Sequence, residues 1–143
     1  MDGEVNSERL LGVWRLVSYV IEDLETKERM HLFGERPTGY LALLPAGRAF
    51  AIITAEGRSV PTTCGDRDVA FRSMLSYSGR YVVKGETFST DVDIAWNEAW
   101  VGTKQNRTYR IEGDDLFIMA QPQPNPNFGN RMMQGILTWR RES

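Results

Sequence analysis

Alternation of apolar and polar residues with a period of two runs through most of this chain, and it constrains the fold more than any other feature. Such alternation is typical of β-strands that bury one face. It marks eight segments, which we expect to be strands: residues 12–22, 38–44, 48–54, 77–83, 86–96, 102–111, 115–119 and 130–141. Several connections are short and contain glycine, which tight hairpin turns require at positive φ. The strands are therefore expected to pair as an antiparallel meander.

Only residues 66–76 are expected to form a helix, because apolar residues recur there four positions apart. One helix cannot cover eight strands, so the sheet must bury its apolar face on itself, as a barrel or a sandwich. The long excursion 54–76, which contains this helix, is expected to lie across a barrel end as a lid. The proline-rich segment 121–129 is expected to form a stiff loop that narrows a barrel end and adds no rungs to the sheet.

Composition restricts the classes of function. The 143 residues, 41% hydrophobic and 25% charged, suffice for one domain, which we place at residues 10–143 after an N-terminal extension of residues 1–9. A net charge of −2 gives no reason to expect a nucleic-acid partner. The longest apolar runs have about five residues, against the roughly 20 that span a bilayer, so membrane insertion is not expected.

The single cysteine and the single histidine restrict the chemistry further. Cys64 has no second cysteine with which to form an internal disulfide, so the reducing cytoplasm is the expected location. With His31 as the one imidazole, neither a thiolate-rich nor a multi-histidine metal site can be assembled. We expect no metal and no cofactor, and we leave a homodimer open.

Several short motifs occur in a fixed order along the chain: GVW at residues 12–14, PTGY at 37–40, YSGRY at 77–81, WVGT at 100–103 and LTWRR at 137–141. In this combination the chain resembles the bacterial and fungal lipocalin-like domain family, from about Leu10 to Arg141. The resemblance implies an all-β fold, an eight-stranded antiparallel up-and-down barrel, and the one short helix predicted above is expected to cross a barrel end. The resemblance also implies that Trp14 closes one end beneath an arginine of the last strand, Arg140 or Arg141, in a structural latch.

Polar residues that face the lumen of such a barrel are the most informative ones. In the segment 102–111, the residues expected inside are Thr103, Gln105, Arg107, Tyr109 and Ile111. An unpaired guanidinium is too costly in an apolar interior, so Arg107 needs a partner. That partner is either internal, such as a carboxylate, a phenol or water, or it is an acidic or carbonyl-bearing ligand. A bulge that shifts the alternation is the third possibility.

Two further strands add candidates for the lumen. In the segment 86–96, one face carries Phe88, Thr90, Val92, Ile94 and Trp96, all expected inside. Tyr77 and Tyr81 are expected to point the same way, and Trp96 and Trp100 to form an aromatic rim. Together the candidate ligand contacts are Gln105, Arg107, Tyr109, Tyr77, Tyr81, Tyr40, Phe88, Trp96 and Trp100.

Three functions remain open. The first, which we favour, is binding of a small and mostly apolar molecule that carries an acidic or carbonyl group. The second is a cofactor-free isomerase, lyase or cyclase for a small aromatic or terpenoid-like metabolite, in which Arg107 stabilises an oxyanion and Tyr109 or His31 moves a proton. The third is a ligand-free interaction module with a plugged barrel, which predicts no enclosed cavity of roughly 300 Å³ or more.

Overall fold

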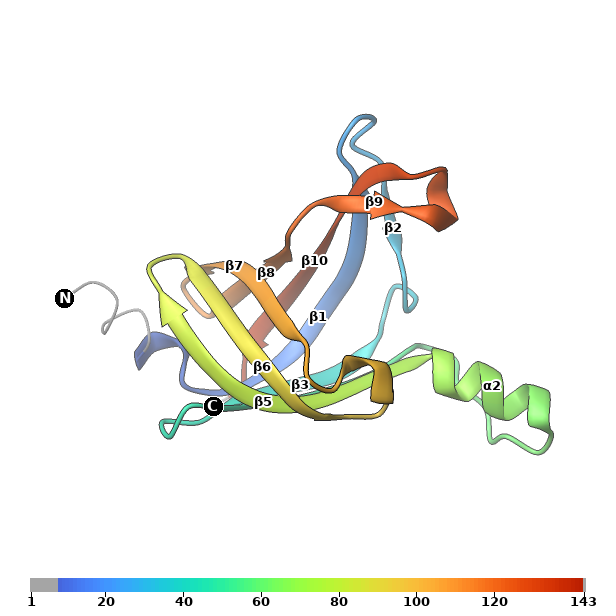
Figure 1. The fold of residues 1–143 in the computed structure, drawn as a ribbon, viewed down its shortest axis with the longest axis horizontal. Helices are drawn as coiled ribbons and strands as arrows, with labels where there is room; N and C mark the ends of the chain where they lie inside the picture. Colours follow the sequence, from blue (N-terminus) through green and yellow to red (C-terminus); the bar gives the residue numbers. More distant parts are fainter. Residues whose placement is uncertain (1–7, 143) are drawn as a thin grey trace.

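The computed structural model describes residues 8–142 and consists mainly of strands (Figure 1). They are joined by the single-turn 3₁₀ helices η1 (Glu98–Trp100) and η2 (Pro126–Phe128) and by the α-helix α2 (Cys64–Arg72). The strands are β1 (Gly12–Asp23), β2 (Arg29–His31), β3 (Thr38–Leu43), β4 (Arg48–Thr54), β5 (Met74–Lys84), β6 (Thr87–Ala95), β7 (Lys104–Glu112), β8 (Asp115–Ala120), β9 (Gln123–Asn125) and β10 (Arg131–Arg141).

The sheet closes on itself. Its strand order is β2-β1-β3-β4-β5-β6-β7-β8-β10-β9, and an additional pairing joins β1 to β10. Trp14 shows the closure, because it lies opposite Leu41 of β3 and opposite Arg141 of β10. All pairings are antiparallel, which confirms the predicted eight-stranded barrel; β2 and β9 are additions outside its wall. Of the predicted N-terminal extension, all but the last two residues lie outside the described part of the chain.

One barrel end is filled by an aromatic and cationic stack. Trp14 is 0% exposed, and its indole Nε1 donates a hydrogen bond to the Leu10 carbonyl at 2.9 Å. The guanidinium carbon of Arg141 lies 4.2 Å from the centroid of the Trp14 ring, and the same guanidinium donates to backbone carbonyls of the segment 9–11. Arg140 points outward into an ion pair with β8. Of the two arginines expected over Trp14, Arg141 is therefore the one that stacks there.

The helix differs from the sequence prediction in its extent and in its place. It ends at Arg72, because residues 74–76 pair with β4 as the first rungs of β5. Its N-cap is Thr63, whose hydroxyl accepts a hydrogen bond from the Asp66 amide. None of its residues is buried, and it projects away from the barrel wall (Figure 1). The prediction of a lid across a barrel end is wrong, since nothing on this helix packs over the lumen.

A β-bulge between β5 and β6 changes which residues face out. Ser78 pairs with Ile94, but the next residue, Gly79, pairs with Val92, so β6 has one extra residue at this point. Val92 is 3% exposed and faces in, whereas Ile94 is 63% exposed on the outer surface. The prediction that Ile94 faces the lumen is wrong for this reason. At Gly79 a Cβ atom would collide with the carbonyl oxygen of Asp91, so the bulge requires glycine.

The strands β1 and β10 continue beyond the barrel and carry the two short strands at their edges (Figure 1). Pro124 lies in β9 opposite Met132, so the prediction that segment 121–129 adds no rungs is wrong. Proline is accepted there because β9 is an edge strand, where a backbone N–H is not needed on the outer side. At the tip of this extension, Asp23 is paired with Arg131, with 2.8 Å between Oδ2 and Nε.

Candidate functional site

The barrel encloses a small hollow above the Trp14 end. Its volume is about 70 Å³, well below the roughly 300 Å³ at which sites that enclose a drug-sized ligand begin. The wall is mostly apolar, with a few polar groups among the side chains. It is lined by Tyr19, Leu41, Ala51, Ile53, Leu75, Tyr77, Phe88, Trp100, Gln105, Arg107, Ile118, Leu137 and Trp139.

Arg107 is the charged member of this lining. The predicted alternation is confirmed within β7, because Gln105 and Arg107 line the hollow while Lys104 and Thr108 are exposed. The prediction is wrong for Thr103, which lies before β7 and is exposed. The guanidinium is half-buried, and its Nη1 donates one hydrogen bond, to the Asn106 carbonyl at 3.0 Å. Within residues 8–142, no carboxylate forms an ion pair with it. Most of its five N–H donors are therefore unused by the protein.

Two phenols accompany the guanidinium. Burial raises the pKa of Tyr19 and of Tyr77 above that of an ordinary tyrosine, and the positive charge of Arg107 offsets part of this rise in both. The two hydroxyls consequently stay protonated at neutral pH and can donate hydrogen bonds. Among the described residues neither hydroxyl has a hydrogen-bond partner. Tyr77 is held in place by Trp100, with ring centroids 5.7 Å apart.

The indole of Trp139 adds a further donor to the same hollow. Trp139 is 2% exposed, and its Nε1 is a buried polar atom without a hydrogen-bond partner in the described part of the chain. Buried donors are nearly always paired, and an unpaired one costs about 1–3 kcal/mol. Tyr19, Tyr77, Arg107 and Trp139 thus present several N–H and O–H donors to one apolar hollow, without a carboxylate to receive them.

Tyr19 and Trp139 were missed as site residues. A bulge between Leu16 and Ser18 reverses the alternation of β1, so Tyr19 lines the hollow although simple counting from Trp14 places it outside. Nothing in the sequence marks this bulge. Trp139 was a component of the C-terminal motif, and its inward direction follows from its pairing with Leu16.

Three of the predicted tyrosines do not line the hollow. The Tyr81 hydroxyl donates to the Leu44 carbonyl at 2.8 Å, and the Tyr109 hydroxyl donates to the Gly85 carbonyl at 3.0 Å. Both carbonyls belong to turns at the Trp14 end, so these hydroxyls are committed to the protein itself. Tyr40 lies on the outer face of β3 and is 41% exposed.

The predicted aromatic rim is only partly in place. Trp100 lines the hollow and meets Trp96 edge to face, with ring centroids 4.8 Å apart. Trp96 itself lies outside the lining, where its Nε1 donates to the Phe71 carbonyl at 2.9 Å. His31 is exposed on the short strand β2 and does not line the hollow. Trp100 and Phe88 are thus the predicted aromatic contacts, besides Tyr77, that reach the hollow.

Over residues 8–142, no three His, Cys, Asp or Glu side chains come together in a way that could hold a metal ion. No helix in the same part of the chain has the length and apolarity to cross a membrane.

The fold agrees with a comparison to known families. No curated protein matches this sequence. A family model described as the lipocalin-like domain matches residues 11–142, nearly the whole chain and the entire barrel. Barrels of this kind generally bind small molecules. The chain therefore belongs to the lipocalin-like domain family.

Proposed function

We propose that this barrel binds a small molecule through a carboxylate or carbonyl group that accepts hydrogen bonds from Arg107. The observation that carries the proposal is the surplus of donors in the hollow: a guanidinium, two phenols and an indole N–H, with no carboxylate among the described lining residues. A ligand that only donates hydrogen bonds could bond to the phenol oxygens, but it would leave the guanidinium and the indole N–H unsatisfied. A ligand with acceptor oxygens satisfies several of them at once.

Energetics favour an acidic ligand over a neutral one. Hydrogen bonds to a charged group contribute about 1.5–3 kcal/mol each, roughly twice the contribution of neutral ones. The apolar walls, with Ile53, Ile118 and Leu137 among them, lower the local dielectric and strengthen the attraction between a carboxylate and Arg107. The aromatic rings of Trp100 and Phe88 then supply apolar contact for the rest of the molecule.

The volume restricts the size of what enters. About 70 Å³ corresponds to two or three water molecules at roughly 30 Å³ each, so only a head group of a few atoms fits in the hollow as it stands. Taken alone, this volume favours a plugged barrel. A barrel that has evolved to be plugged would, however, satisfy its own buried donors, and Trp139 and Arg107 are not satisfied in this way. We therefore place the head group inside and the apolar remainder at the mouth beside Trp100.

A cofactor-free isomerase, lyase or cyclase is the weaker proposal. Such an enzyme needs a base near the ligand, and the lining residues in the described chain include no carboxylate and no imidazole. His31 is remote from the hollow, and the Tyr109 hydroxyl is bonded to a backbone carbonyl. Binding without turnover is the function that these side chains support best.

We also propose the cytoplasm as the compartment. Cys64 is exposed and free, and a small domain kept in an oxidising compartment is more often reinforced by disulfides.

The size of the hollow favours a metabolite over a polymer as the ligand, since a nucleic acid could not enter it.

The test is a binding series with matched ligands. Isothermal titration of the full chain with straight-chain and aromatic monocarboxylates, and with the alcohols of the same carbon skeleton, separates the contribution of the acid group. We expect the carboxylates to bind, the alcohols to bind at least about tenfold more weakly, and Arg107→Met to remove the difference. Arg15→Met, an exposed arginine on the outer face of β1, is the control and should bind like the wild type.

The outcomes separate the three functions. Equal binding of acids and alcohols would overturn the role of Arg107. No binding of any member of the series would favour the plugged barrel. A new product after incubation, detected by mass spectrometry and lost in Arg107→Met, would favour the enzyme.

A further inference from the structure

One outer face of the barrel is apolar. Tyr40 of β3, Phe50 and Ile52 of β4 and Ile94 of β6 are 41–63% exposed and point away from the lumen. Tyr40 lies directly opposite Ile52, and Phe50 and Ile94 both lie opposite Ser78, so the four side chains are neighbours across the sheet. Outward positions of an isolated barrel are normally polar. The exposed apolar residues therefore form a patch and are not scattered singly.

The other side of the barrel shows the normal pattern. The exposed residues of β7 are Lys104, Thr108, Arg110 and Glu112, and β10 exposes Arg140 toward Asp115 of β8. Outward-facing positions on this side of the barrel therefore carry mainly charged side chains. This contrast makes the apolar patch a local feature and not a property of the whole wall.

The patch is hollowed and continues onto the helical arm. An open groove of about 580 Å³ is lined by Phe50, Ile52 and Ile94 together with Met74 and Trp96. Trp96 contacts Phe71 of α2, with ring centroids 5.7 Å apart, and Phe71 is itself 45% exposed. We call these seven residues the outer apolar face: Tyr40, Phe50, Ile52, Phe71, Met74, Ile94 and Trp96.

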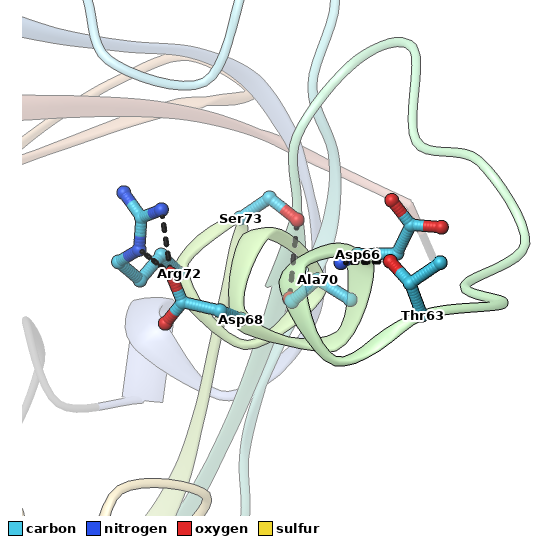
Figure 2. A network of polar contacts seen from close by, with 6 residues as sticks. All are labelled: Thr63, Asp66, Asp68, Ala70, Arg72 and Ser73. Atoms are coloured by element: carbon cyan, nitrogen blue, oxygen red, sulfur yellow. Dashed lines mark hydrogen bonds and ion pairs between the residues drawn. The ribbon is translucent and has the colours of Figure 1, made fainter.

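The helix α2 has few tertiary contacts in a monomer, chiefly those of Phe71 with Trp96 and of Ala70 with Arg58. Figure 2 shows its local contacts: Thr63 caps its N-terminus, Asp68 pairs with Arg72 at 2.8 Å, and Ser73 donates to the Ala70 carbonyl. These contacts are exposed, and exposed pairs of this kind contribute only a few tenths of a kcal/mol. A helix of 9 residues is marginal in water unless an apolar face is buried, and none of its residues is buried.

We propose that the outer apolar face packs against the same face of a second copy of this chain, giving a two-fold symmetric dimer in which each α2 reaches over the groove of its partner. In such an isologous contact each copy supplies both the groove and the projecting helix. The two features that lack a counterpart in one chain then satisfy each other. The net charge of −2 gives little repulsion between copies.

The area of the outer apolar face is large enough for a stable contact with a second copy of the chain. Five side chains of the outer apolar face are 41–63% exposed and offer on the order of 80 Å² each, and Met74 and Trp96 offer less, so the face offers roughly 500 Å² in total. Interfaces between identical chains are about 65% apolar. An apolar area of roughly 500 Å² therefore corresponds to a total interface of about 800 Å² per partner, polar rim included. About 800 Å² per partner is the size of a standard stable interface.

Sedimentation velocity of the full chain over a concentration series tests the proposal. We expect the wild type to approach twice its monomer mass of 16.3 kDa as concentration rises. Ile94→Lys should weaken dimerisation at least about tenfold, because it places a charge in the middle of the contact. The matched control is Thr108→Lys, an exposed position on the polar side, which should dimerise like the wild type. Far-UV circular dichroism verifies that each variant is folded.

Two results would overturn the proposal. One is a wild type that stays at 16.3 kDa at every concentration, which would leave this face for a different partner. The other is an Ile94→Lys variant that dimerises as tightly as the wild type. If Ile94→Lys fails to fold, Phe71→Lys replaces it, because Phe71 lies on α2 outside the barrel wall and its side chain is 45% exposed.

Discussion

Replacing Arg107 by methionine is expected to stabilise the empty protein while weakening ligand binding. Methionine keeps an unbranched stem of similar length and removes the guanidinium. In the wild type that group sits in an apolar hollow, bonded to one backbone carbonyl and paired with no carboxylate in the described chain. The unpaired guanidinium thus lowers the stability of the empty protein, while it places a cation where a ligand can bind.

The size of the effect follows from two opposing contributions. Exchanging a buried charge for an apolar side chain of similar volume stabilises proteins by about 1–4 kcal/mol, and a half-buried group such as Arg107 belongs at the lower end of that range. Losing the hydrogen bond from Nη1 to the Asn106 carbonyl costs about 1 kcal/mol. The net expectation is a gain of up to about 1 kcal/mol in the free energy of unfolding.

Equilibrium unfolding in urea, without ligand, measures this gain. With a slope of about 2 kcal/mol per molar urea, the midpoint should rise by up to about 0.5 M. Arg15→Met, on the outer face of β1, should stay within about 0.5 kcal/mol of the wild type. An Arg107→Met variant that is less stable than the wild type by 1 kcal/mol or more would refute the reasoning, because it would mean that the guanidinium has a stabilising partner inside the barrel.

Three further results are expected. Trp14→Ala should lower the free energy of unfolding in urea by about 3–5 kcal/mol, because the ring is 0% exposed at the closed barrel end; a loss under 1 kcal/mol would contradict the latch. Burial raises the pKa of Asp23, but two backbone amides and Arg131 together hold this pKa below the ordinary value. The ionised carboxylate therefore stabilises the fold above about pH 4, and this contribution is lost as pH falls through the lowered pKa. Asp23→Asn should therefore flatten the acid limb of a stability profile measured by thermal melting, and an unchanged limb would speak against this pairing. Gly79→Ala should lower the thermal midpoint clearly, since a Cβ atom collides with the Asp91 carbonyl; an unchanged midpoint would show that the bulge is able to relax.

The alternation of residues along the chain was sufficient to predict an antiparallel sheet that folds onto itself. The alternation of residues in segments such as 38–44 and 48–54 requires one buried face, and eight such segments with a single helix can hide that face only on the sheet itself, as a barrel or a sandwich. The motifs that resemble the lipocalin-like domain family favour the barrel. The same alternation correctly placed Gln105 and Arg107 inside. Both conclusions hold because the two-residue period of a strand is set by backbone geometry and does not depend on its neighbours.

The predictions were wrong where neighbouring strands shift relative to each other. Bulges in β1 and β6 turn Tyr19 into the hollow and Ile94 out of it, and no local residue pattern marks the extra residue. The predicted helix extended too far because apolar residues four apart in 66–76 also suit the first rungs of β5, where pairing with β4 decides the outcome.

The sequence by itself determined that this chain forms an antiparallel sheet that buries its apolar face on itself, because strand periodicity and the cost of exposed apolar surface act along the chain. The family resemblance then favoured a barrel, with the cation of Arg107 directed inward. Only the tertiary structure decided what surrounds that cation. The meeting of Tyr19, Tyr77, Arg107 and Trp139 around one small hollow depends on interstrand register and on two bulges, which pairwise contacts between distant segments fix. Tertiary contacts likewise direct α2 away from the barrel and leave one outer wall apolar.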